Sequence, residues 1–277
     1  MTSTQGQEGQ RGQRGQSIAP RAPRRSSPPS IAAISVMLAV MAAPVAAQSI
    51  ADQVRSVEDG QVRFSFASRE GVCGDGQQIS THRQTEDWEG PCEPGPARVA
   101  IDVEDGVVVD IDTYVGGRWL PRESSRDLGM VSVNEAADYL LSLAETASGD
   151  VSERAMFPAS IADSVEVWPR LLRLAKDERR PQDARKAAVF WLSMIAADVA
   201  VEELGELVND TDGDLEVRKM ALFGLSQLPD NQGVSALLDV ARTNENHEMR
   251  RQAIFWLGQT EDPRAVALFE EILTSKR

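Results

Sequence analysis

The chain has 277 residues, of which 42% are hydrophobic and 26% are charged, a globular rather than a disordered or fibrous composition. This length corresponds to one or two domains of roughly 100–200 residues each. The net charge of −14 argues against nucleic acids and anionic membrane surfaces as partners, because each requires a basic footprint. The aromatic content of only 5% leaves few side chains on which nucleic-acid bases could stack.

Residues 1–47 have the pattern of a secretory signal peptide. Five arginines precede a short apolar run at 31–43, and Val45 and Ala47 stand at positions −3 and −1 of a small-residue cleavage site. The run is shorter than the about 20 apolar residues of a transmembrane helix. We expect cleavage, export to the periplasm or the extracellular space, and no membrane insertion afterwards; an uncleaved N-terminal anchor is the alternative.

Two cysteines remain in the exported part, Cys73 and Cys92. A pair with none left over in an exported protein predicts one disulfide. Closing a loop of this length stabilises a fold by about 3 kcal/mol in the chain-entropy model. A metal or redox pair is the weaker alternative, because the spacing is neither Cys-x-x-Cys nor that of zinc ligands.

Residues 48–125 are predicted to form a small antiparallel β module that the disulfide pins. Apolar residues alternate with polar ones from Val62 to Phe66, from Val99 to Val103 and from Val107 to Ile111. The Asp105-Gly106 step between the last two runs is a strong hairpin signal. We therefore expect one face of this sheet to be buried.

The polar face of the predicted hairpin is acidic, with Asp102, Asp110 and Asp112 along it and Glu104 and Asp105 at its tip. Clustered carboxylates are ligands that Ca²⁺ accepts. A solvated polar strand face explains the same alternation without an ion and is the favoured interpretation.

Residues 134–277 are predicted to form a helical repeat with an N-terminal capping helix at 134–146. A ten-residue pattern recurs three times, with its arginines at Arg185, Arg218 and Arg250. A second helix follows each copy, at 201–208, 234–241 and 265–273, and a degenerate fourth copy precedes them, in which Phe157 matches Phe190. One helix pair cannot bury its apolar stripe alone, so the pairs must stack into an α-solenoid. The predicted fold class is therefore α+β, a small β module followed by an all-α solenoid.

This pattern resembles HEAT repeats, in particular the short bacterial kind also named for phycobilisome lyases. The resemblance is carried by Val217-Arg218-x-x-Ala221-Leu222-x-x-Leu225, by Met249-Arg250-x-x-Ala253-Ile254-x-x-Leu257-Gly258 and by the following Glu261-Asp262-Pro263-Arg264-Ala265-Val266. It covers roughly residues 150–275 and implies a bacterial scaffold that binds proteins or peptides. The bilin-attaching activity of the lyases does not carry over, because a fold does not determine its chemistry.

No catalytic motif accompanies these repeats, and we expect neither enzymatic activity nor a cofactor. The two histidines, His82 and His247, have no ligand partners at helical spacing. The Phe190-Trp191 and Phe255-Trp256 pairs suggest packing between repeats rather than a ligand-binding box. The repeated arginines are expected to pair with acidic residues of adjacent repeats.

The second helices of such solenoids are expected to line a concave groove. Their polar residues are the candidate partner-binding residues: Arg170, Arg173, Glu202, Glu203, Glu206, Asp239, Glu270 and Glu271. This groove would be mostly acidic and basic at one end, which suits a basic peptide or protein patch, while a merely solubilising face explains it equally well. The sequence thus predicts an exported, non-enzymatic scaffold. The alternative is an envelope enzyme or an enzyme regulator whose active surface lies on the β module.

Overall fold

The structure is a computed structural model that describes residues 48–76, 79–81, 92–195 and 197–274. The described residues belong to one compact unit, 47–277, and all that follows concerns this unit. The predicted signal peptide and His82 lie outside the described residues. Within the described residues, no helix is both long and apolar enough to cross a membrane.

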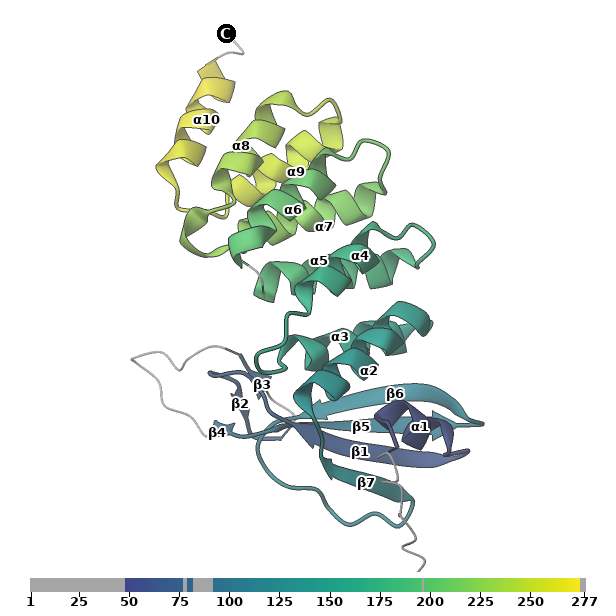
Figure 1. The fold of residues 1–277 in the computed structure, drawn as a ribbon. Helices are drawn as coiled ribbons and strands as arrows, with labels where there is room; N and C mark the ends of the chain where they lie inside the picture. The colour runs from purple at the N-terminus through teal and green to yellow at the C-terminus, as the bar shows by residue number, and fades with distance from the viewer. Residues whose placement is uncertain (1–47, 77–78, 82–91, 196, 275–277) are drawn as a thin grey trace, which may run out of the picture. The chain divides into compact units, whose positions relative to one another are not determined.

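The main sheet has four strands in the order β6-β5-β1-β7 (Figure 1). Strand β1 (Gly60–Phe66) pairs antiparallel with β5 (Ala97–Glu104), and β5 pairs antiparallel with β6 (Val107–Tyr114). The predicted Asp-Gly hairpin is confirmed, with both turn residues at positive φ, 50° for Asp105 and 72° for Gly106. Strand β7 (Ser125–Met130) pairs with β1 in parallel and was not expected from the pattern, because only two of its six residues are apolar.

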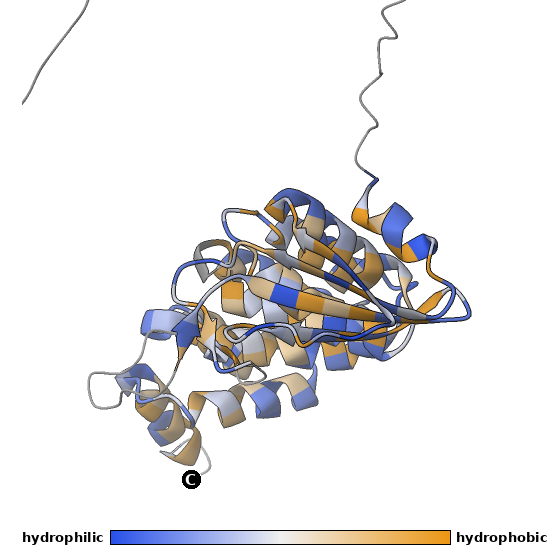
Figure 2. Cartoon of the chain, turned by 90° about the horizontal axis from the view of Figure 1, so that it is seen from below, coloured by the Kyte–Doolittle hydropathy of each residue, from blue (hydrophilic) through white to orange (hydrophobic). Residues whose placement is uncertain are grey.

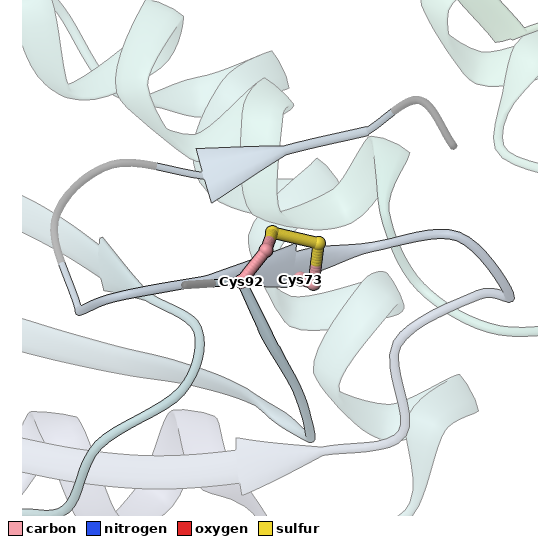
Figure 3. Close-up of a disulfide and its surroundings, with 2 residues drawn as sticks. All are labelled: Cys73 and Cys92. Atoms are coloured by element: carbon pink, nitrogen blue, oxygen red, sulfur yellow. A yellow bond between two sulfur atoms is a disulfide. The ribbon is translucent and has the colours of Figure 1, made fainter. Parts of the chain in front are cut away.

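A second, smaller sheet contains the disulfide. Its strands are β2 (Cys73–Gly74), β3 (Ile79–Ser80) and β4 (Glu93–Pro94), in the order β3-β2-β4. Cys73 and Cys92 are bonded, with their Cα atoms 5.2 Å apart (Figure 3). The predicted disulfide is therefore confirmed, and it joins the first strand of this sheet to the residue that precedes the last.

Both faces of the central strand β1 are covered. Val62, Phe64 and Phe66 are fully buried on the face that packs against helices. On the opposite face, Arg63 stacks on Trp119, with its guanidinium carbon 4.8 Å from the centre of the ring. Hydrophobic and hydrophilic residues accordingly alternate along the strands in Figure 2.

Helix α2 (Val133–Thr146) joins the sheet to the helical region. Its Tyr139 ring meets Phe64 of β1 edge-on, with centroids 6.5 Å apart. Glu135 accepts a hydrogen bond from the main-chain N–H of Ile50, the first residue of α1 (Ile50–Arg55), over 2.8 Å. Buried residues of sheet and helices form one continuous apolar cluster. The sheet and the repeats thus share a core, with α2 between them.

The remaining helices follow in pairs, as the repeat predicts. They are α3 (Asp150–Ser160) with α4 (Trp168–Lys176), α5 (Gln182–Ile195) with α6 (Ala197–Asn209), α7 (Leu215–Ser226) with α8 (Val234–Thr243), and α9 (His247–Leu257) with α10 (Pro263–Thr274). A short 3₁₀ turn, η1 (Pro229–Asn231), precedes α8. The fold class, a small β-sheet region followed by helical repeats, is as the sequence predicts (Figure 1).

The same hydrogen bond within a helix recurs at equivalent positions of three first helices. The hydroxyls of Ser160, Ser193 and Ser226 each donate to the carbonyl three residues earlier, over 2.7 Å. The equivalence of Ser160 to the later serines supports α3 and α4 as the degenerate first copy. Helix α3 ends two residues after Pro158, which removes a main-chain donor from the helix.

Candidate protein-binding surface of the helical repeats

The repeated arginines bind backbone carbonyls, not the acidic residues that we expected. Nε of Arg185 donates to the carbonyl of Ala175 near the end of α4, and Nε of Arg218 donates to Val208 near the end of α6, each over 3.1 Å. Arg250 donates to the carbonyl of Asn244, just after α8, over 2.7 Å. The last carbonyls of a helix lack donor partners within the helix and carry partial negative charge, which explains this preference.

Four of the eight candidate partner-binding residues form ion pairs between second helices or with α2. Arg170 of α4 binds Glu145 of α2 through two nitrogens, at 2.8 and 2.5 Å. The Glu145 hydrogen bond raises the pKa of Arg170 against the opposing effect of burial. Arg242 of α8 likewise pairs with Glu271 of α10 over 3.2 Å.

Lys176 of α4 bridges the acidic candidates of α6. Its Nζ lies 3.3 Å from a carboxylate oxygen of Glu203 and 3.0 Å from one of Glu206. Burial disfavours the ammonium, but the hydrogen bonds to Glu206 and Glu203 outweigh it and raise the pKa of Lys176. The charge of these two glutamates is therefore partly offset within the protein.

The other four candidates are exposed on the second helices: Arg173, Glu202, Asp239 and Glu270. Within the described part of the chain, none of them forms an ion pair. A groove of about 810 Å³ beside Arg173 is lined by Lys176 and Arg179 as well as by Glu145 and Asp177. Among the candidates without an ion pair, the charge is basic on α4, at Arg173, and acidic on α6, α8 and α10. That these residues bind a partner stays a prediction.

A row of aromatic rings runs along the first helices. We call it the aromatic row, and it consists of Phe157, Trp191, Phe190, Phe223, Trp256 and Phe255. Between helices, Phe157 and Trp191 have centroids 5.1 Å apart, and Phe190 stacks on Phe223 at 6.2 Å with an interplanar angle of 8°. The expected packing between repeats is confirmed, yet the rings are only partly buried and Phe255 is 52% exposed.

The acidic face of the β5–β6 hairpin is partnered. Ligand atoms of Asp102, Asp110 and Asp112 lie within 4.8 Å of one another. Asp102 accepts from Gln61 over 2.9 Å, Asp110 pairs with Arg154 of α3 over 2.8 Å, and Asp112 accepts from the hydroxyl of Tyr114 over 3.1 Å. These partners account for the three carboxylates as a polar sheet face, the interpretation that we favoured, and calcium binding stays the untested alternative.

The comparison with protein families identifies the class of the helical region. Residues 210–277 match the family model described as HEAT repeats. The matched segment contains α7 to α10, the two repeat pairs in which the sequence pattern is clearest. The C-terminal region is therefore a HEAT-repeat region. A comparison with curated proteins found no match.

Proposed function

We propose that this protein is an exported, non-enzymatic scaffold that binds a protein or peptide on its HEAT-repeat surface. The observation that carries the proposal is the HEAT-repeat match over α7–α10, because repeats of this class commonly mediate protein interactions. The proposed contact residues are the exposed, unpaired charges of the second helices, with Glu202, Asp239 and Glu270 in the acidic part. A basic segment is the proposed partner, since charge complementarity accelerates encounter and fixes register.

The test of this proposal is a charge reversal with a matched control. The triple variant Glu202→Lys, Asp239→Lys, Glu270→Lys changes exposed carboxylates on the repeats, and Glu58→Lys, Glu104→Lys, Glu123→Lys changes three exposed carboxylates around the sheet. Both would be used, as oxidised residues 48–277, to capture partners from envelope extract. We expect a stoichiometric partner with the wild type and the control, and its loss with the first variant. A partner kept by the first variant contradicts the proposed surface.

Export is proposed from the pattern of residues 1–47 and from the disulfide, which persists in oxidising compartments. N-terminal sequencing of the protein recovered from a bacterial envelope fraction tests it. A first residue of Gln48 is expected. A protein that starts at Met1 and stays in the membrane fraction indicates the uncleaved anchor instead.

An enzyme or enzyme regulator with its active surface on the sheet is the second candidate. It is favoured by the close approach of Asp102, Asp110 and Asp112 beside Tyr114. This alternative predicts that Asp102→Asn with Asp112→Asn abolishes an activity or a capture that the repeat variant retains. If the two sheet substitutions leave every partner in place, the alternative is wrong.

A further inference from the structure

A cavity of about 590 Å³ lies beside the link between α3 and α4, and its lining contains none of the charged second-helix residues proposed above. Its lining includes Arg69, from the segment after β1, and Val165, Glu166 and Trp168, from the link and the start of α4. Val199 of α6 adds a further apolar side chain. The wall of the cavity thus combines apolar side chains with Ser160, Ser164, one cationic group and one anionic group.

The backbone holds Arg69 firmly at this wall. Its N–H donates to the carbonyl of Ile161 over 2.9 Å, and the N–H of Asp163 donates to the carbonyl of Ala67 over 3.0 Å. The hydroxyl of the neighbouring Ser68 donates to the carbonyl of Gly95 over 2.7 Å. The main chain of Arg69 is thus held in place before any ligand binds, so that binding has to order only its side chain.

The guanidinium of Arg69 is half-buried and has no partner among the described residues. Burial lowers its pKa, and no neighbouring carboxylate counteracts the effect. The group still carries its charge at neutral pH, because an arginine side chain in a protein is effectively always protonated. A desolvated and unpaired cation is costly, and an anion that enters the cavity would remove the cost.

We propose that this cavity binds a monoanionic carboxylate attached to an apolar or aromatic group, with Arg69 as its ion-pair partner. The planar guanidinium matches a carboxylate with two parallel hydrogen bonds. Val165, Val199 and the indole of Trp168 provide the contact surface for the apolar group. The exposed carboxylate of Glu166 disfavours a second negative charge, so a phosphate dianion fits less well.

Calorimetric titration of oxidised residues 48–277 tests the proposal with phenylacetate, phenylacetamide and phenyl phosphate as probes. Phenylacetate is expected to bind at least tenfold more tightly than the neutral amide, which is about 1.4 kcal/mol, and more tightly than phenyl phosphate. Equal affinities for acid and amide, tighter binding of the phosphate, or no binding of phenylacetate at 10 mM (about 2.7 kcal/mol of affinity) would each overturn it.

Two arginine variants assign the site. Arg69→Gln is expected to weaken phenylacetate at least tenfold, whereas Arg118→Gln, an exposed arginine outside the cavity lining, leaves the affinity unchanged. An Arg69→Gln protein that binds as the wild type contradicts the assignment.

The acetylated tripeptide Ala-Ala-Phe, as free acid and as amide, distinguishes the C-terminus of a peptide from a small acid. If the tripeptide with a free C-terminal carboxylate binds more tightly than phenylacetate, the ligand of the cavity is a peptide C-terminus. If it binds more weakly, the ligand is a small carboxylic acid.

Discussion

Arg185 and Ala175 form a contact that recurs one repeat later in Arg218 and Val208. In each case a buried guanidinium donates through Nε to a carbonyl in the last turn of the preceding second helix, over 3.1 Å. The contact joins successive helix pairs and satisfies a carbonyl that the helix itself leaves without a donor. The arginine of the repeat motif is thus a helix-capping residue.

Replacement of Arg218 by Met tests the strength of this cap. We expect a loss of about 2 kcal/mol in the free energy of unfolding, because a charge-assisted hydrogen bond is removed and a buried carbonyl is left unpaired. Lys219→Met is the matched control, since the neighbouring Lys219 makes only surface ion pairs, with Glu216 and Glu248, and should cost less than about 1 kcal/mol. Urea titration measures both, and equal losses would contradict the capping role.

A shared core predicts that sheet and repeats unfold together. Leu140 of α2 is fully buried in the apolar cluster that spans both. Leu140→Ala should lower the free energy of unfolding by about 3 kcal/mol. Hydrogen exchange read by mass spectrometry should show faster exchange in β1 and in α5 alike. Acceleration confined to one of the two regions would indicate separate folding units.

Gly233 and Gly205 differ in the space that an added side chain would find, so alanine substitutions at the two positions test the packing between α7 and α8. A Cβ atom on Gly233 would stand 2.0 Å from the carbonyl oxygen of Leu225, whereas one on Gly205 meets nothing within 4 Å. Gly233→Ala should therefore destabilise by about 1–3 kcal/mol. Gly205→Ala, within α6, should stabilise by roughly 0.5–1 kcal/mol through helix propensity. Thermal unfolding measures both changes in stability, and an unchanged unfolding temperature for Gly233→Ala would refute the close approach to Leu225.

Removal of the disulfide should weaken the protein without changing the repeats. Cys73 and Cys92 are separated by 19 positions, and closing a loop of that length in the unfolded state is worth about 3 kcal/mol. We expect Cys73→Ser with Cys92→Ser to lose this amount in urea unfolding. Reduction of the wild type with dithiothreitol should give the same loss, and the double variant should not respond to it. A reductant effect on the variant would point to a different cause.

The ionised carboxylate of Asp262 should make the free energy of unfolding depend on pH in the acid range. Hydrogen bonds from the Arg264 side chain and main chain lower the pKa of Asp262 from 3.8 to about 2. Because the folded pKa is depressed, this stabilisation is present above pH 3.8 and disappears as the pH falls through about 2. The free energy of unfolding of Asp262→Asn should be lower than that of the wild type at pH 5, and the difference should shrink towards pH 2. A difference that is constant with pH excludes the ionic contribution.

The repeated helices, the hairpin and the disulfide pair were predictable because each leaves a local signal. The copies around Arg218 and Arg250 fix helix positions by their period. Asp105-Gly106 marks a turn because these two residue types tolerate the positive φ that a tight hairpin turn requires. Strand β7 left no such signal, since only Leu128 and Met130 of its six residues are apolar and Met130 is 65% exposed.

The partners of the charged residues were decided only by tertiary structure. The sequence by itself determined which residues are charged and, through the repeat period, on which helix each lies. Whether Glu203 is free or bound to Lys176, whether Arg185 meets a carboxylate or the carbonyl of Ala175, and whether Arg69 has any partner depend on how helices distant in sequence pack. Ion pairs and caps act over a few ångströms, so their pairing follows from the geometry of the fold and leaves no periodic pattern in the sequence.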